Sequence, residues 1–512
     1  MGKTVPRAAR RKRVYLPEVR MIPDHSTSRR ALLSRTALGF GSLALNAMLS
    51  NRPTQAESTN VESSPPLAPQ SPLAPRPPHF AARAKSVVFL FMQGGVSHVD
   101  TFDPKPALDK YDGQEPPFKR TRIKFAKRGN LLKSPWKFRP TGDSGIPMSS
   151  LWQHLPAVAD DLCMVHSVCD TNVAHGGATM KLFTGSDLSV RPSLGSWISY
   201  GLGTEDADLP SYINICPSSI HGGVNNWGAA FLPSNHQGVP LGTPGYPNSP
   251  AATARFKYMN TAKVGRLERM QLQLMRDLAA QDKSNDSELD ARLQTFELAF
   301  RMQMAAPDAL DLSSETKETR SLYGMDQKPT EDFGRQCLMA RRMVERGVRF
   351  IQVNHAGSLR SQGIPTNEQW DQHSYLKKGH AVNAAQIDLP ITGFLQDLKA
   401  RGLLDETLVV WAGEFGRTPT SQAGDGKNVG RDHHTDGFTI WMAGGGVKGG
   451  FRYGETDEFG YYTIKDRMTL HELHATILHL LGLDHTRLTW HYASRDFRLT
   501  DVYGNVAHDL IS

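Results

Sequence analysis

Short apolar runs recur along the chain from residue 86 onward. Each run has the length of one strand, and nearly all of its positions are apolar, which is typical of strands buried on both faces of a sheet. The runs cover residues 86–92, 162–168, 211–215, 348–353, 407–412 and 438–443. We therefore expect a central sheet that is covered on both sides.

Segments with helical spacing lie between several of these runs. Residues 265–281 place Leu267, Met270 and Leu274 on one face of a helix, and residues 336–347 end at a glycine, as helices often do. Strands that alternate with helices favour an α/β fold with a mostly parallel central sheet and helices on both faces.

A further amphipathic helix is predicted near the C-terminus, at residues 471–483, "HELHATILHLLGL". This segment resembles a zinc protease motif, but that motif needs a second histidine four residues after the first, and Ala475 stands there. The glycine-rich residues 444–450 lack the Lys-Ser/Thr ending of a phosphate-binding loop, so we expect a turn.

The N-terminal 56 residues differ from the rest of the chain in charge. They hold 11 Lys and Arg against 2 Asp and Glu, whereas the remainder holds 48 against 49. The formal net charge of +8 therefore belongs to this segment, which argues against a nucleic-acid-binding face on the folded part. Arg29-Arg30 precedes a short apolar run at 36–49, and together they predict a twin-arginine export signal. An amphipathic basic helix is the alternative.

The apolar run is too short to form a stable transmembrane anchor, so we expect a periplasmic or extracellular protein. Residues 65–78 contain seven prolines, which predicts a linker over residues 57–80 and a folded domain over residues 81–512. The four cysteines form no Cys-x-x-Cys motif. We expect all four in the core, with a disulfide between Cys163 and Cys169 as the alternative.

Polar side chains gather just after the predicted strands. In an open α/β sheet, ligand sites form at the carboxyl ends of the strands, so these positions test for a site. Four strand ends and the loop "GRDHHTDG" at 430–437 supply such groups: His98, Asp100, His175, His355, Asp371, His373, Glu414, Arg417, His433 and His434.

Mixed sets of histidine and carboxylate are typical of sites for divalent metals such as Zn²⁺ or Mn²⁺. We predict metal ligands at His98, Asp100, Asp371, His373, Glu414, His433 and His434. Asp371 and His373 are two residues apart, which places both on one face of an extended segment. The alternatives are structural: a helix N-cap at Asp371, a hydrogen-bonded loop histidine at His98, and an ion pair between Glu414 and Arg417.

We expect the loop 430–437 to fold back over the sheet edge, so that one of its histidines meets Asp371, His373 and Glu414. Two carboxylates in one pocket would repel each other and lose hydration, and a divalent cation would remove both penalties. A hydrogen-bonded cluster without a metal is the alternative. His355, by contrast, is expected to have a structural role.

Several longer motifs resemble a known family. They are "FLFMQGGVSHVDTFDPKP", "VAHGGATMKLFTG", "ARRMVERGVRFIQV", "WDQHS", "RGLLDETLVVWAGEFGRTP" and "GRDHHTDGFTIWMAGGGVKGG". Over roughly residues 81–505 the chain resembles the exported bacterial family called domain of unknown function 1501, which is related to the alkaline phosphatase and sulfatase superfamily. The resemblance implies an alkaline-phosphatase-like fold.

The resemblance also implies a role for His175. In the superfamily a strand ending in Thr-Gly follows the nucleophile by ten residues, and counting back from Gly185 places His175 at that position. The Cys/Ser-x-Pro-x-Arg signature of sulfatases is missing from the sequence, which excludes chemistry on a formylglycine.

The implied metal ligands are altered rather than lost. The superfamily's Asp-x-x-x-His pair has its nearest counterparts in Asp371 and His373, and its final histidine corresponds to one of the two histidines in the loop 430–437. A later Asp-His pair is Glu414-Phe415 here, so one ligand is missing.

Two functions are compatible with these features. The first is a secreted, metal-dependent hydrolase of phosphate or sulfate esters on small molecules or polysaccharides. In it, His175 acts as nucleophile or as general acid and base, and Arg417 pairs with the oxyanion. The second is a catalytically silent member of the superfamily that binds a glycan or a protein partner. The fold alone does not decide between them, because function belongs to the site.

Overall fold

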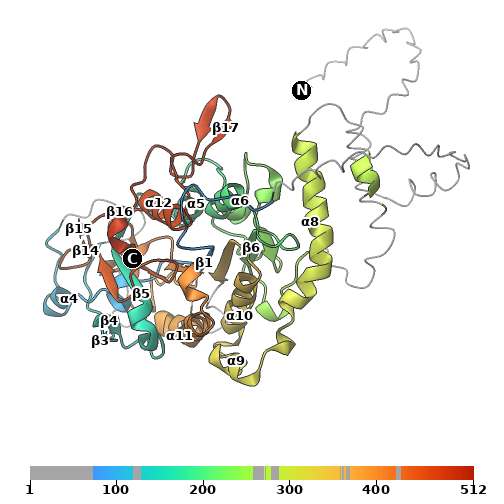
Figure 1. Ribbon diagram of the computed structural model, residues 1–512. Coiled ribbons are helices and arrows are strands. Elements are labelled where there is room, and N and C mark those ends of the chain that lie inside the picture. Colours follow the sequence, from blue (N-terminus) through green and yellow to red (C-terminus); the bar gives the residue numbers. More distant parts are fainter. Residues whose placement is uncertain are drawn as a thin grey trace, which may run out of the picture. The chain divides into compact units, whose positions relative to one another are not determined.

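The six predicted strands all form, and they lie in one nine-stranded sheet (Figure 1). They are β1 (Ser86–Met92), β5 (Leu162–Cys169), β6 (Tyr212–Ile215), β8 (Phe350–His355), β9 (Thr407–Ala412) and β12 (Phe438–Ala443). Every residue of these strands is buried, which is why their sequences are apolar at nearly every position. The sheet is completed by β7 (Val239–Leu241), β13 (Phe451–Tyr453) and β16 (Met468–Thr469).

The strand order is β13-β5-β12-β9-β1-β8-β6-β7, with β16 paired to β5. Within this sheet all pairs are parallel except those of β12, which runs antiparallel to β5 and β9. The prediction of a mostly parallel sheet is confirmed. Because β12 is reversed, its N-terminal end lies beside the carboxyl ends of β5 and β9. The segment before β12 therefore reaches the edge at which α/β folds place their ligands.

Helices cover both faces of the sheet, as predicted (Figure 1). The even-numbered apolar residues of β1 pack in one core with α10 (Glu331–Glu345) and α11 (Leu376–Ala400). The odd-numbered residues of β1 pack in a second core with α5 (His175–Thr184), α6 (Leu194–Leu202) and α12 (Leu470–Leu480). The predicted C-terminal helix is α12, which begins with a capping box between Thr469 and Glu472.

A smaller three-stranded sheet carries the segment "GRDHHTDG". Its order is β11-β10-β2, and its strands are β2 (Arg128–Leu131), β10 (Gly416–Gln422) and β11 (Arg431–His434). Half of the predicted loop is thus a strand, in which His433 pairs with Arg417 and His434 with Gly416. Because successive side chains of a strand point to opposite faces, only one of the two histidines can face a given site.

The remaining elements surround these sheets. They are α3 (His98–Thr101), α4 (Pro106–Lys110), the hairpin of β3 (Phe138–Thr141) and β4 (Ile146–Ser149), α8 (Ser287–Leu310), α9 (Lys317–Leu322), the pair β14 (Glu455–Thr456) and β15 (Thr463–Lys465), and the pair β17 (Trp490–Tyr492) and β18 (Arg495–Phe497). The four cysteines are buried and free, so the alternative of a Cys163–Cys169 disulfide is wrong.

The computed structural model describes residues 73–118, 128–257, 273–277, 287–357, 369–422 and 428–512, together with residues 270, 359, 363 and 364. The predicted export signal at 1–56 and most of the predicted helix at 265–281 lie outside these residues. No helix in the described part of the chain is both long and apolar enough to cross a membrane.

Residues 69–512 form one compact unit, which begins before the boundary predicted at residue 81. Leu73 is buried, and its carbonyl accepts a hydrogen bond from the Thr204 amide at 2.8 Å. The Arg76 amide donates to the Leu202 carbonyl at 2.9 Å. Proline does not prevent its neighbours from forming such bonds, so a proline-rich segment can still lie fixed on a folded surface.

Candidate metal centre

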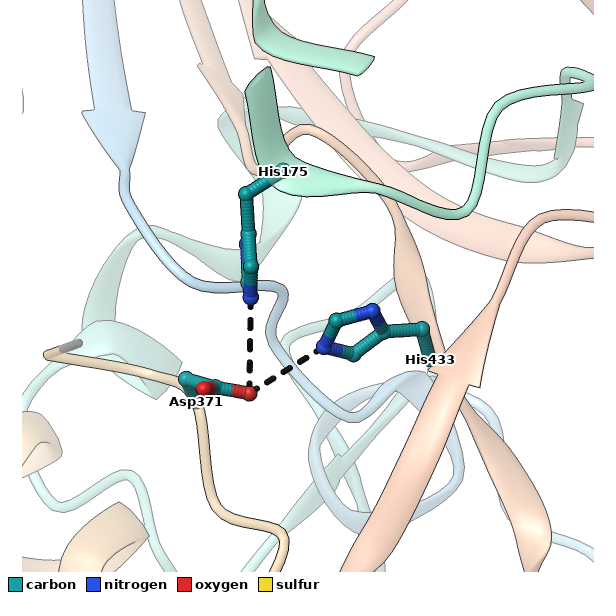
Figure 2. Close-up of side chains that lie close together, drawn as sticks. All are labelled: His175, Asp371 and His433. Carbon is teal, nitrogen blue, oxygen red and sulfur yellow. Dashed lines mark hydrogen bonds and ion pairs between the residues drawn. The ribbon is translucent and has the colours of Figure 1, made fainter. Parts of the chain in front are cut away.

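Three imidazoles and one carboxylate come together at the carboxyl edge of the sheet. His175 is the first residue of α5 and follows β5, whereas Asp371 and His373 precede α11. His433 lies in β11, just before the reversed strand β12. Figure 2 shows the rings of His175 and His433 pointing toward the Asp371 carboxylate from two sides. We call His175, Asp371, His373, Glu414 and His433 the Asp371 site.

One oxygen of Asp371 is the focus of this site. His373 Nε2 lies 2.9 Å from Asp371 Oδ1, and His433 Nε2 lies 3.3 Å from the same oxygen. The two Nε2 atoms are themselves 2.9 Å apart. His175 Nε2 is 3.6 Å from Asp371 Oδ1, and ligand atoms of His175, Asp371 and His433 all lie within 4.8 Å of one another. The sequence prediction that segments near 371 and 433 meet at this edge is therefore realised in space.

The outer ring nitrogens fix which way these histidines face. His433 Nδ1 lies 2.7 Å from the Val173 carbonyl, and since a carbonyl can only accept, this nitrogen carries the proton. His373 Nδ1 contacts Gln422 Oε1, with Asp432 Oδ1 at 3.8 Å as a second acceptor. In the neutral ring of His433, Nε2 then presents its lone pair to the site. Such outer hydrogen bonds are usual for histidines that bind metals.

These distances fit a divalent ion. Zinc binds histidine nitrogen and carboxylate oxygen at about 2.0–2.2 Å, which sets tetrahedral ligand atoms about 3.3 Å apart. The three contacts among His373 Nε2, His433 Nε2 and Asp371 Oδ1 are 2.9, 2.9 and 3.3 Å. Without an ion, a proton on one of the two Nε2 atoms is needed to keep their lone pairs from facing each other. Burial and the nearby Arg417 lower the pKa of His433 to about 4, so its ring does not carry a second proton to relieve this contact.

Glu414 lies behind His175 rather than on Asp371. Its buried carboxylate accepts from the His175 Nδ1–H at 2.6 Å and from the Gly94 amide at 3.0 Å. Burial opposes the charge of His175, but Asp371 and Glu414 outweigh it and raise the pKa of the ring to about 9. Glu414 thus fixes the orientation of His175, and His175 Nε2 is buried without a hydrogen-bond partner among the described residues.

Arg417 does not have the role predicted from the sequence. Its side chain is 0% exposed, and Nη2 contacts Asp371 Oδ1 at 2.6 Å. Its other N–H groups donate to the carbonyls of Gly95 and Arg431 at 2.9 and 3.1 Å, and Nη2 also contacts the Gly94 carbonyl. Because these N–H groups are already engaged, the Arg417 guanidinium cannot form a bidentate pair with an oxyanion. Although burial opposes the charge, Arg417 holds the pKa of Asp371 well below its usual range.

Arg417 also changes the electrostatic argument for a metal. Asp371 pairs with Arg417 and Glu414 pairs with His175, so each carboxylate already has a cationic or hydrogen-bonding partner. The predicted repulsion between two unpaired carboxylates is therefore not present. The case for an ion rests on the ring nitrogens that face Asp371, not on that repulsion.

Three predicted ligands, His98, Asp100 and His434, lie in a different place. Together with Arg431 they form what we call the Asp100 cluster. Asp100 forms a bidentate pair with Arg431, at 2.7 Å to Nε and 3.1 Å to Nη2, and accepts from Ser97 Oγ at 2.6 Å. His98 Nε2 donates to the Gly460 carbonyl at 2.8 Å, and His434 Nε2 to the Tyr461 carbonyl at 2.5 Å. His434 does not reach Asp371, because β11 turns His433 and His434 to opposite sides. His98 and Asp100, in α3, lie with His434 and Arg431 instead.

Three groups that contact the site histidines were not predicted from the sequence, whereas His355 has the structural role that was predicted. The Val173 carbonyl, Gln422 and Phe415 orient the histidines, and Phe415 packs against the rings of His175 and His433 with centroids 4.9 and 4.4 Å away. Nothing in their spacing marks them as site residues. His355 has hydrogen bonds on both ring nitrogens, to Trp370 Nε1 at 2.9 Å and Gln386 Oε1 at 2.8 Å, which agrees with a structural role.

The segment before Thr184-Gly185 is a helix rather than the expected strand. His175 begins α5, and Gly185 ends it with φ of 69°. The left-handed conformation of this position suits glycine and terminates the helix. His175 therefore lies at the start of a helix, at the mouth of the sheet edge.

The family described as "Protein of unknown function (DUF1501)" matches residues 84–511. The chain belongs to this family. No curated protein matches the DUF1501 chain.

Solved structures show more distant similarities to this DUF1501 protein. The lipoteichoic acid synthase LtaP from Listeria monocytogenes is 11% identical, with a TM-score of 0.35 over 80% of this chain and 76% of that one. The alkaline phosphatase of the Antarctic bacterium TAB5 is 10% identical, with a TM-score of 0.30 over 78% and 98%. A protein in the alkaline phosphatase superfamily from Vibrio parahaemolyticus is 11% identical, with a TM-score of 0.32 over 83% and 72%.

Proposed function

We propose that this DUF1501 protein is an exported, metal-dependent hydrolase of phosphate or sulfate esters. The observation that supports the proposal is the convergence of His373 Nε2 and His433 Nε2 on one oxygen of Asp371. These three groups would hold a divalent ion, Zn²⁺ or Mn²⁺, and three protein ligands leave a further coordination position open, as in catalytic zinc sites. A bound ion would supply Lewis acidity to the ester.

His175 is the proton donor of the proposed reaction. Its Nδ1–H is held by Glu414, so Nε2 points toward Asp371 and holds the proton that a departing alkoxide needs. Glu414 is 1% exposed and is itself fixed by the Gly94 amide, which keeps the ring in one orientation. His373 is the most exposed of the three histidines, at 32% of its side chain, so substrate would approach from its side.

Arg417 and the outer hydrogen bonds have positioning roles. Arg417 keeps Asp371 ionised and in place from the buried side. The Val173 carbonyl and Gln422 keep the inner nitrogens of His433 and His373 available as ligands. Binding of the ion therefore needs little rearrangement of these side chains.

Two substitutions separate the roles of ligand and acid. Chelator-treated protein would be supplied with Zn²⁺ or Mn²⁺ and assayed on phenyl and p-nitrophenyl esters of phosphate and sulfate. We expect His175→Gln to retain the ion and to lose about 100-fold or more in turnover. The loss should be greater on the phenyl ester, whose leaving group depends more on a proton donor. Asp371→Ala should lose both the ion and turnover.

His98→Gln is the matched control, because His98 lies in the Asp100 cluster. It should retain both the ion and turnover. Wild-type protein that binds an ion but hydrolyses none of the esters would overturn the proposed activity and favour a catalytically silent binding protein. Loss of the ion in His175→Gln would instead show that His175 is a ligand.

The proposed export rests on Arg29-Arg30 before the apolar run at 36–49. Replacing both arginines with lysine should leave the protein in the cytoplasm when cell fractions are compared by immunoblot. Unchanged export of this variant would contradict the twin-arginine route. The measurement is independent of any activity.

A further inference from the structure

A second cavity opens at the same edge of the sheet, on the face covered by α10 and α11. It has a volume of about 590 Å³, within the range usual for small-molecule sites. Its polar lining consists mainly of side-chain amides, together with one cation and one carboxylate: Asn248, Gln336, Asn354, Gln369, Gln386, Lys328 and Asp332. His355, at the end of β8, contributes to the lining as well.

Gln336 belongs to the cavity lining, and its amide oxygen is buried without a partner among the described residues. Gln336 is 2% exposed, and its Nε2 donates to Asp332 Oδ2 at 3.1 Å. The opposite orientation would place the amide oxygen against the Asp332 carboxylate, so the amide is fixed by its neighbour. Among the described residues, none bonds to Gln336 Oε1. A buried acceptor left in this way calls for a donor from outside the protein.

Two further amide oxygens gather nearby. Asn248 Nδ2 is turned toward the Cys216 carbonyl at 3.1 Å, and Gln369 Nε2 donates to Gln386 Oε1 at 2.7 Å. Their oxygens, Asn248 Oδ1 and Gln369 Oε1, would lie 3.6 and 3.5 Å from a Cβ built on Gly357. Gly357 has no side chain, so this space is open beside both acceptors.

Gln386 supplies the complementary donor. Burial lowers the pKa of His355 to about 4, so the ring is neutral. Its Nδ1 accepts from Trp370 Nε1–H at 2.9 Å, and its Nε2–H therefore donates to Gln386 Oε1 at 2.8 Å. With that oxygen used twice, the Nε2 of Gln386 remains as the donor of this amide at the cavity.

We propose that this cavity binds a sugar ring of a neutral oligosaccharide. Hydroxyl groups both donate and accept, so they can donate to the amide oxygens of Asn248 and Gln369 and accept from Gln386 Nε2. Pro247, Phe333 and Val382 provide apolar wall for the C–H faces of the ring. The lining carries one cation, Lys328, and one carboxylate, Asp332, so it has no net charge that would favour an anion.

A neighbouring cavity has a volume of about 420 Å³. The two share Pro329 and Ala385, and the second is lined by Trp136 and Ala381. Ala381 and Ala385 are exposed on α11, and their small side chains project little from the helix surface. The combined space suits several linked sugar units, with Trp136 as an aromatic surface for one of them.

This binding site stands apart from the proposed hydrolysis. Gln369 in the cavity is followed directly by Trp370 and Asp371, so one segment of chain contributes to both places. A carbohydrate held here would be near the Asp371 site along the chain. Its binding nevertheless needs neither the ion nor turnover, so the two proposals can fail separately.

The test is binding of cellohexaose and agarohexaose to the full-length protein, measured by calorimetric titration and by saturation-transfer NMR. We expect at least one of these neutral hexasaccharides to bind. Gln386→Ala should weaken that binding about 10-fold or more, and Ala385→Trp should abolish it by filling the shared space. Gln396→Ala is the matched control, because it is the same change at an exposed position of the same helix.

Ala385→Trp alters an exposed residue, so folding is checked by its circular dichroism and melting temperature. Asp371→Ala should bind the hexasaccharide as the wild type does, which separates this site from the proposed hydrolase. Failure of both hexasaccharides to bind would overturn the proposal. Binding that is unchanged in both cavity variants would overturn it as well. Spermidine is titrated in parallel, and binding of spermidine without binding of either hexasaccharide would show a site for amines instead.

Discussion

The Asp371 site and the Asp100 cluster are built from the same residue types, yet their histidine nitrogens and carboxylate oxygens have different partners. In the Asp100 cluster, Asp100 is paired bidentately with Arg431, and the histidines donate to backbone carbonyls. In the Asp371 site, two histidine nitrogens and one carboxylate oxygen face a common point. The first arrangement pairs its charged groups and its Nε2–H groups within the protein, whereas the second turns ring nitrogens toward one carboxylate oxygen.

This difference shows that buried histidine and aspartate do not by themselves predict a metal. What separates the two regions is the acceptor bound to the outer ring nitrogen. In His433 the Val173 carbonyl takes the Nδ1 proton and leaves Nε2 toward the site. In His434 the Tyr461 carbonyl takes Nε2 instead. The two neighbours on β11 therefore have different chemistry.

The largest expected effect tests the Asp100 cluster as a structural unit. Arg431→Met should lower the free energy of unfolding by about 3–5 kcal/mol, because it leaves a fully buried carboxylate without its partner. Denaturant unfolding of the chelator-treated protein measures this. The double variant Asp100→Ala with Arg431→Met should recover part of the loss, and a loss below about 1 kcal/mol for the single variant would contradict a buried pair.

The second effect belongs to the Asp371 site. Zinc at 100 times its dissociation constant should raise the free energy of unfolding by about 2.7 kcal/mol, since it binds only the folded state. His373→Gln should lose most of this gain, whereas His98→Gln should keep it, although each starts from its own stability without zinc. Equal gains in the two variants would remove the distinction between the regions.

Much of this arrangement could be predicted from the sequence. Strands such as β1, β9 and β12 were predicted residue for residue, because strands buried on both faces must be apolar throughout. The meeting of Asp371, His373 and the 430–437 segment followed from the rule that ligands lie at strand ends. The reversed direction of β12 completes that geometry, but no local pattern marks it.

The orientation of side chains could not be predicted. The alternation of a strand shows that His433 and His434 face opposite ways, but not which of them faces Asp371. Arg417 follows a strand end, where it was expected to pair with an oxyanion, yet it is 0% exposed and pairs with Asp371. Burial of this kind depends on long-range packing, which the chemistry of a residue type does not reveal.

A smaller effect concerns acid. Burial opposes ionisation of Asp100, but Arg431 and Ser97 outweigh it and lower the pKa of the carboxyl group. With the folded pKa below the unfolded value of about 3.9, the stabilisation is present above about pH 4 and is lost as the pH falls through the folded pKa. The stability difference between wild type and Asp100→Asn should therefore shrink in acid, by up to about 1.4 kcal/mol per pH unit. Urea unfolding at several pH values measures this, and a constant difference would contradict it.

The most direct test of the central claim is a zinc titration of three chelator-treated proteins: wild type, His433→Gln and His434→Gln. The two variants make the same change at adjacent positions of one strand, so they differ only in which region they alter. We expect wild type and His434→Gln to bind one equivalent of zinc and His433→Gln to bind none with comparable affinity. Equal zinc binding by the two variants, or none by the wild type, would contradict a metal centre at Asp371.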